Sequence, residues 1–301
     1  MRRVTILVLF LLVALTWGTT WLAMRIAAET IPPMFATGMR FMFAAPCLIV
    51  IAWLRKTPLL FPSGQRLFQL IICIFYFSIP FSLMIYGEKY IDSGLASIIF
   101  ANMPVAVLIA SVLFLNEKTN SMQITGLTIA IISLIGILLE EMKISAGNHW
   151  QGVIALVSAL IIHAIIYTQC KKRSCIVSVI TFNALPCFFA GLILSAAGWF
   201  FESPQTSMFS AQSILSTLYL GTIGGVFGIL CYFSLQQRAR AFQASLVFLV
   251  FPLIAVSLEK YIYGYTISTH SILLIIPLAI GVFLSIFSKK IPATQKLAGG
   301  A

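Results

Sequence analysis

The sequence predicts an all-α integral membrane protein with ten transmembrane helices arranged as two inverted five-helix repeats. Three observations support this fold class: the composition, the spacing of the apolar runs and the distribution of charge. Of the 301 residues, 60% are apolar and only 9% are charged, whereas an ordinary soluble domain is about 45–50% apolar and about 25% charged. So few charges exclude a soluble globular protein and a disordered one.

Ten apolar runs divide the chain, and charged or turn-forming residues separate them. Each run has roughly the length of about 20 residues that a helix needs to cross a bilayer. Because hydrocarbon offers no water to bond the backbone, these runs are expected to be helices. The predicted helices cover residues 5–26, 33–54, 67–87, 93–115, 121–140, 150–169, 176–200, 212–236, 241–259 and 269–288.

The charged residues predict how these helices are oriented. Ten helices place both termini on one side. If that side is the cytoplasm, most Lys and Arg residues lie there, including Arg2, Arg3 and the run 171–173. All acidic residues except Glu117 then lie on the opposite side. This positive-inside asymmetry predicts a multi-pass protein of the bacterial inner membrane with both termini cytoplasmic.

The formal net charge of +11 is therefore a topology signal. The basic residues occur in pairs and triplets between apolar runs, without an aromatic-interleaved basic stripe or zinc-finger spacing. We expect membrane lipid, and no nucleic acid, as a partner.

The chain resembles itself when it is shifted by 148 residues (244 − 96). Ala96 then falls on Ala244, and Pro104 falls on Pro252. We therefore predict two halves of five helices each, residues 1–145 and 146–301. An odd number of helices makes the second half enter the membrane in the inverted direction. Such repeats are typical of secondary transporters, whose substrate site lies near the midplane between the halves.

The sequence carries no recognisable catalytic or cofactor motif. No GxxxxGK[ST] motif occurs, so ATP hydrolysis is not expected. No cluster of His, Cys, Asp or Glu has metal-ligand spacing. All eight acidic residues lie at helix ends or in loops. We therefore predict a non-enzyme without catalytic residues, cofactor or metal, and we expect no buried carboxylate.

Ionisable groups inside the predicted helices are the first candidates for function, because burying them in hydrocarbon is costly. Arg40 could hold a substrate carboxylate, or it could snorkel or pair with Glu29. His163, which a shift of 146 residues (163 − 17) aligns with Trp17, could couple a proton near neutral pH. It could equally make one buried hydrogen bond.

Aromatic and polar residues at inner positions could build an amphipathic cavity. The substrate-binding candidates are Trp17, Arg40, Tyr86, Asn102, His163, Tyr167, Gln236 and Ser245. Trp and Tyr are also common as anchors at the membrane interface, and Asn102 could instead bond carbonyls that Pro104 frees. Pro104 and Pro252 are candidate hinges. Glu117 is a candidate gating residue that could equally cap its helix.

Small residues predict one close helix contact. Gly221 and Gly225, and Gly224 and Gly228, form two overlapping GxxxG motifs, a spacing that lets helix backbones approach closely. We predict packing inside the bundle, with a homodimer contact as the alternative. The chain is thus expected to be a monomer or a homodimer.

Three segments resemble the EamA-type transporters of the drug/metabolite transporter superfamily. They are TWGTTWLAMRIA, IPPMFATGMRFMFAAP and GLASIIFANMPVAVLIASVLFLNE. Trp17, Gly18, Arg40, Pro104 and Glu117 match the family pattern, and the second half matches it more loosely. The resemblance implies ten helices in two inverted five-helix repeats and alternating-access transport of small metabolites. Many members of the family export amino-acid-like compounds.

We therefore expect a secondary transporter that exports a small amphipathic, amino-acid-like substrate across the inner membrane. An uptake carrier of the same fold and a membrane-embedded sensor or accessory protein without transport are the alternatives. Rocking of one half against the other would open the cavity to each side in turn. Without a buried carboxylate, we expect facilitated diffusion or weak proton coupling through His163.

Overall fold

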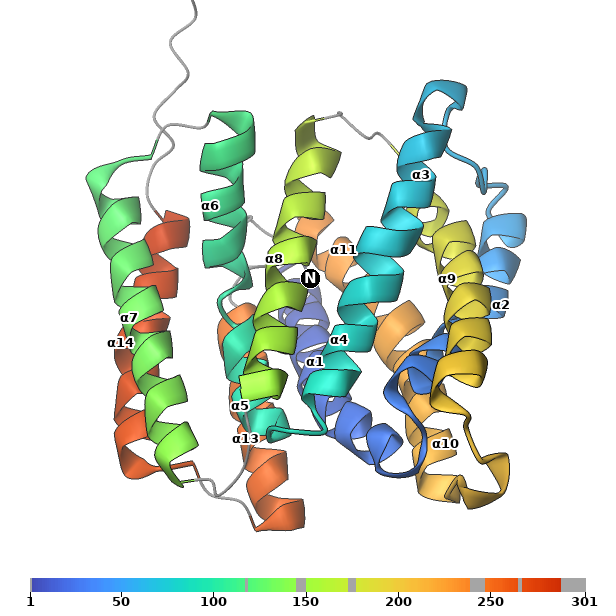
Figure 1. Cartoon of the computed structure of the whole chain (residues 1–301). Helices are drawn as coiled ribbons and strands as arrows, with labels where there is room; N and C mark the ends of the chain where they lie inside the picture. The colour runs from blue at the N-terminus through green and yellow to red at the C-terminus, as the bar shows by residue number, and fades with distance from the viewer. Residues whose placement is uncertain are drawn as a thin grey trace, which may run out of the picture.

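The computed structural model describes residues 2–116, 119–144, 150–172, 177–238, 247–264 and 267–287. Every regular element within these ranges is helical, and the helices pack side by side as a bundle (Figure 1). For the described residues, the prediction of an all-α fold is confirmed.

The helices follow one another along the chain with short connections. In residues 1–145 they are α1 (Arg2–Thr30), α2 (Pro33–Leu54), the 3-10 turn η1 (Ser63–Gln65), α3 (Arg66–Ile72), the π-helical segment η2 (Cys73–Ser78), α4 (Ile79–Gly87), α5 (Ser93–Phe100), α6 (Met103–Leu115) and α7 (Ser121–Ile144). In residues 146–301 they are α8 (Trp150–Lys172), α9 (Val179–Glu202), the 3-10 turn η3 (Thr206–Met208), α10 (Ala211–Tyr219), the π-helical segment η4 (Leu220–Phe227), α11 (Gly228–Arg238), α13 (Val247–Tyr263) and α14 (Thr269–Phe287).

Eight helical stretches of the described chain are long and apolar enough to cross a membrane. They are Val4–Thr30, Pro33–Leu54, Ser63–Gly87, Ser93–Leu115, Ser121–Glu140, Trp150–Cys170, Val179–Glu202 and Ala211–Leu235. These stretches coincide with the first eight predicted helices. Within the described residues, α13 and the apolar helix Thr269–Leu284 are shorter. The count of ten therefore stays a prediction.

Three predicted helices are interrupted where the sequence predicts continuous ones. The run 93–115 separates into α5 and α6 at Ala101 and Asn102. Pro104 comes two residues after Asn102, and because proline lacks an N–H group it cannot bond the carbonyl one turn earlier. The runs 67–87 and 212–236 instead contain η2 and η4. Such π-helical turns are rare and occur frequently at functional sites.

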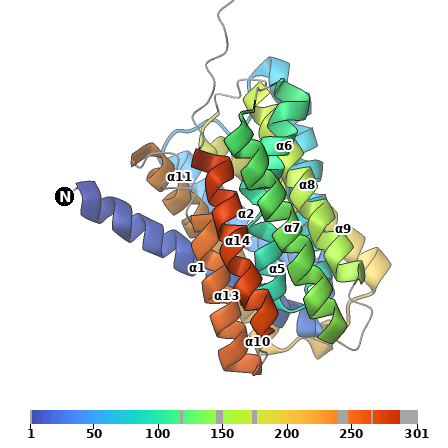
Figure 2. The same ribbon diagram turned by 90° about the vertical axis from the view of Figure 1, so that its left-hand side faces the viewer.

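The main helix contacts join the two halves of the chain. The pairs α2 and α9, α7 and α14, α1 and α13, and α4 and α8 each combine a helix of residues 1–145 with one of residues 146–301. α7 and α14 lie side by side, at the left edge of the bundle in Figure 1 and at its front in Figure 2. Figure 2 also shows the first turns of α1 standing away from the other helices. The halves therefore interleave.

The glycines of the GxxxG motifs pack against helices of the first half. A side chain at Gly221 would overlap the carbonyl oxygen of Arg40 on α2, and one at Gly224 would lie 2.6 Å from Cγ2 of Thr20 on α1. At Gly228 the nearest atoms would include those of Trp17 at 3.0 Å. The glycines thus bring the η4 region onto α1 and α2, and the predicted close packing inside the bundle is confirmed.

Candidate functional site

A cavity of about 150 Å³ lies between the two halves of the bundle. Its walls come from helices of both halves, and most of the lining side chains are aromatic or contain sulfur. The lining residues are Trp17, Thr20, Trp21, Met24, Arg40, Tyr76, Phe81, Met84, Phe100, Met103, His163, Tyr167, Ile229, Phe248 and Phe251. Apolar walls with a few polar groups are typical of small-molecule sites.

Two tryptophans of α1 contact aromatic residues of other helices around the cavity. The Trp17 ring lies 4.7 Å from that of Tyr232 and 5.9 Å from that of Phe248. One turn further, Trp21 lies 5.0 Å from Phe100 of α5. The spacing of four residues on a helix places both tryptophans on one face, so α1 carries a continuous aromatic surface that bridges both halves.

Arg40 contributes a buried cation to this wall. Its residue is only 7% exposed, and its guanidinium lies 4.6 Å from the centroid of the Phe81 ring. Nη1 lies 3.9 Å from the sulfur of Met24, and Nε has no hydrogen-bond partner. No Asp or Glu occurs among the described lining residues. The cavity therefore presents a guanidinium without a carboxylate to neutralise it.

His163 and two tyrosines form further polar contacts of the cavity lining. Nε2 of His163 lies 3.1 Å from the carbonyl oxygen of Tyr76, and the hydroxyls of Tyr76 and Tyr167 lie 3.1 Å apart. A carbonyl can only accept a hydrogen bond, so Nε2 carries the proton in this contact. Nδ1 is then an acceptor, and it is buried without a partner.

The structure brings four of the predicted binding residues together: Trp17, Arg40, His163 and Tyr167. Tyr86 does not line the cavity. It is 36% exposed and lies 5.0 Å from the ring of Tyr90 at the end of α4. Asn102 is buried behind the cavity wall, where its amide donates to the carbonyl of Ile98 at 3.2 Å.

The structure describes two of the remaining predicted residues in full. Pro104 lies at the start of α6, and Pro252 lies within α13 beside a cavity-lining phenylalanine. Glu117 and Ser245 lie outside the described residues, as does the side chain of Gln236. Their roles as gating or binding residues stay predictions.

Sequence reasoning missed Tyr76 and Phe81, which line the cavity beside His163 and Arg40. Tyr76 lies within η2, and Phe81 lies just after it in α4. The wider π-helical turn rotates the helix faces on either side of it, and this rotation brings both side chains to the cavity. A continuous α-helix of period 3.6 cannot predict that shift. The only available signal was aromatic composition, which many other positions share.

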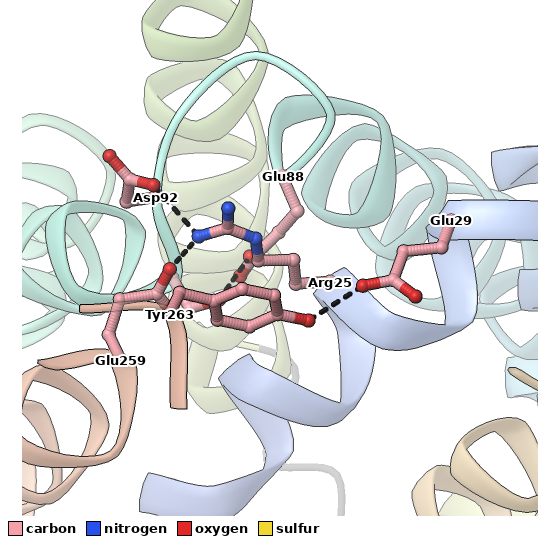
Figure 3. Close-up of polar contacts among 7 residues, drawn as sticks. Arg25, Glu29, Glu88, Asp92, Glu259 and Tyr263 are labelled. Carbon is pink, nitrogen blue, oxygen red and sulfur yellow. Dashed lines mark hydrogen bonds and ion pairs between the residues drawn. The ribbon is translucent and has the colours of Figure 1, made fainter. Parts of the chain in front are cut away.

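A second polar cluster lies on helices that also line the cavity, further along each of them (Figure 3). Here Arg25 of α1 meets Asp92, which precedes α5, and Glu259 of α13. Glu88, the residue after α4, and Glu259 are 4% and 0% exposed. The expectation that no carboxylate is buried is therefore wrong. Both acids lie at a helix end in sequence, but contacts between the two halves cover them.

The fold and the cavity together define a membrane transporter: apolar helices from two interleaved halves enclose a small cavity with a buried cation. Comparison with known proteins then identifies the family. The profile of the EamA-like transporter family matches residues 4–139 and 150–287. Because this match spans most of the chain, the protein belongs to that family.

The chain is similar to relatives along nearly its whole length. It is 76% identical to "Protein PagO" of Salmonella typhimurium over 98% of this chain and 97% of that protein. A more distant relative from the same organism, named "Probable amino-acid metabolite efflux pump", is 22% identical over 97% of this chain and 98% of its own length. A crystal structure with 16% identity matches 95% of this chain and 97% of its own with a TM-score of 0.66. This last likeness concerns the fold.

Proposed function

We propose that this protein is a secondary transporter that exports small amphipathic, amino-acid-like metabolites, and that Arg40 binds the carboxylate of its substrate. The observation that carries the proposal is the buried Arg40 guanidinium, which faces a cavity without any described acid. A buried charge is normally paired. A planar guanidinium recognises a carboxylate with two parallel hydrogen bonds.

The cavity dimensions support a small substrate. A cavity of about 150 Å³ is comparable to an engineered protein cavity of about the same volume that binds benzene. The faces of Trp17 and Trp21 would hold the apolar part of the substrate, and aromatic faces also attract an ammonium group. The efflux function in the name of the distant relative agrees with export, and no cofactor enters the proposal.

We further propose ten transmembrane helices and alternating access by two inverted halves, residues 1–145 and 146–301. The two family matches, 4–139 and 150–287, support the division. The contacts support it as well, since α1 packs on α10 and α11 while α8 packs on η2 and α4, the equivalent positions of the other half. The positive-inside asymmetry supports an inner-membrane protein with cytoplasmic termini.

Counterflow in liposomes tests this function. Purified protein would be reconstituted at equal pH on both sides, and uptake of labelled amino acids would be measured against an internal excess of the same compound. Saturable counterflow of at least one member of the panel is the expected result. Binding without counterflow would contradict transport and favour a sensor or accessory protein.

The substitution Trp17→Ala is expected to lower the transport efficiency of that substrate by roughly 10- to 100-fold. Burial of a large apolar group against such a wall contributes about 1.5–3 kcal/mol. Trp53→Ala is the matched control, because Trp53 is 77% exposed at the end of α2. Equal losses in both variants would contradict a binding role for Trp17.

A further inference from the structure

The polar cluster around Arg25 lies on the same helices as the cavity, further toward one end of the bundle. Its members follow cavity-lining residues on three different helices. Arg25 is next to Met24 on α1, and Glu88 comes one turn after Met84 of α4. On α13, Glu259 comes two turns after the lining residue Phe251. A substrate that leaves the cavity toward this end must pass between these helices.

The contacts of the cluster join the two halves of the chain (Figure 3). Nη1 of Arg25 lies 2.8 Å from Oδ1 of Asp92 and forms an ion pair with Glu259. The guanidinium also lies 4.0 Å from the centroid of the Tyr263 ring, and the Tyr263 hydroxyl donates to Glu29 at 2.6 Å. Residues of α1 and of the α4–α5 connection are thereby tied to α13.

The cluster contains more acid than its cation can neutralise. The cluster holds one arginine and four acids, Glu29, Glu88, Asp92 and Glu259, so the net charge of these five side chains would be 1 − 4 = −3 with every carboxyl ionised. Oε2 of Glu88 accepts a hydrogen bond from the Ser93 hydroxyl at 2.9 Å, whereas Oε1 is buried without a partner. Oε2 of Glu259 is also buried without a hydrogen bond.

Solvent reaches the cluster from outside the bundle. A hollow of about 320 Å³ is lined by Arg25, Glu29, Glu88 and Asp92 together with the neighbouring Lys89 and Tyr90. Figure 1 places the α4–α5 connection and the end of α13 at the same end of the bundle. By the predicted topology, this end faces away from the cytoplasm.

We propose that the Arg25 cluster is the outer gate of the transport path, closed while the Glu88 carboxyl holds a proton and opened when that proton is released to water in the hollow. Ionised Glu88 would compete with Asp92 and Glu259 for the single guanidinium of Arg25. The repulsion among the three carboxylates would then separate α13 from the α4–α5 connection. This inference rests on the proposed alternating-access transport.

The direction of the pH effect follows from burial. Burial raises the pKa of the Glu88 carboxyl well above its usual range, and Asp92 adds to the rise, while the Ser93 hydroxyl and Arg25 oppose it. In an open gate Glu88 would be hydrated, with an ordinary pKa of about 4.3. The closed state therefore binds the proton more tightly. Its stabilisation is complete at low pH and is lost as pH rises through the raised pKa.

Arg25 from α1, Asp92 from the α4–α5 connection and Tyr263 from α13 act directly on Glu88. The other titratable groups of the cluster are Glu29 of α1, which contacts Tyr263, and Glu259 of α13, which contacts Arg25. The flanking Lys89 and Lys260 are exposed. Only Arg25 places a buried or half-buried positive charge within the cluster. Loss of one proton from Glu88 therefore adds a negative charge that no further cation of the cluster neutralises.

Distance measurements between spin labels test the gate without a substrate. Lys89→Cys and Tyr261→Cys place labels at exposed positions of the two elements that would separate. The six native cysteines would be replaced, and the protein would be studied in lipid nanodiscs from about pH 5 to about pH 9, since buried glutamates with pKa values of about 8–9 are known. A longer distance should grow from a minor to the major population as pH rises.

Two variants and one control make the result specific. Glu88→Gln should keep the short distance at every pH, and Ser93→Ala should move the transition to higher pH because it removes a bond to the ionised carboxyl. Glu140→Gln changes an acid of α7 that contacts His270 and should behave like the wild type. An unchanged distance in the wild type, or a full transition in Glu88→Gln, would overturn the gate.

Counterflow at equal pH separates this inference from the proposed function. If the distance shifts with pH but the amino-acid panel shows no counterflow, the gate stands and the proposed substrate transport fails. If counterflow occurs and the distance does not change with pH, only the gate fails.

Discussion

Replacing Arg40 by glutamine is expected to reduce transport by roughly 30-fold or more without weakening the fold. Removing one partner of a buried, hydrogen-bonded charge pair costs about 2–5 kcal/mol, and each 1.4 kcal/mol is about tenfold in affinity. In the described structure Arg40 has no acidic partner. A neutral amide therefore removes an unpaired buried charge, and the unfolding temperature should stay the same or rise.

The measurement compares counterflow and thermal unfolding of the same detergent-purified variant. Arg55→Gln is the control, because Arg55 follows the last turn of the same helix and is exposed. Transport loss with unchanged or raised thermal stability would identify Arg40 as a binding residue. A parallel loss of transport and stability would instead make it a structural residue and contradict the proposal.

The second large effect is expected at Gly221, where addition of a single methyl group should destabilise the bundle. The new carbon would overlap the carbonyl oxygen of Arg40 and lie 3.0 Å from Cβ of Phe43. Backbone atoms cannot rotate away, so η4 and α2 must separate, at a cost of about 1–3 kcal/mol. Without that contact, alanine would stabilise a helix by roughly 0.5–1 kcal/mol relative to glycine.

Thermal unfolding in detergent checks this prediction. We expect Gly221→Ala to lower the apparent unfolding temperature by roughly 5 °C and to reduce transport, since Arg40 must move with its backbone. Gly64→Ala is the matched control, because a carbon added at Gly64 meets no atom within 4 Å. If Gly221→Ala were as stable as the wild type, η4 and α2 would not be packed closely at this position, and the prediction would be wrong.

The sequence predicted the elements that depend on local pattern. Apolar runs and breakers placed the first eight membrane helices, and the EamA resemblance is confirmed by the family match. Polar or aromatic residues within apolar helices predicted Trp17, Arg40, His163 and Tyr167, which the structure gathers in one cavity. Polar and ionisable groups are costly to bury in hydrocarbon, so their presence within an apolar run marks them as candidates for function.

Other features depend on contacts between distant segments. The sequence predicts Tyr86 as an inward-facing tyrosine, but it lies next to the last residue of α4, is 36% exposed and does not line the cavity. The interruptions η2 and η4 leave the apolar composition unchanged, so hydropathy cannot reveal them. Glu88 reads as a loop residue. It is only 4% exposed, because Arg25 of α1, Tyr263 of α13 and the neighbouring helix α8 gather around the end of α4.

The most direct test of the central claim is a comparison of an amino acid with its amino alcohol, for example labelled phenylalanine and phenylalaninol, or leucine and leucinol, in counterflow. The two members of each pair differ in the carboxylate and little else. If Arg40 binds that carboxylate, the acid will show saturable counterflow that Arg40→Gln reduces by roughly 30-fold or more, and the alcohol will show none. Equal counterflow of acid and alcohol, unaffected by Arg40→Gln, would contradict the proposed site.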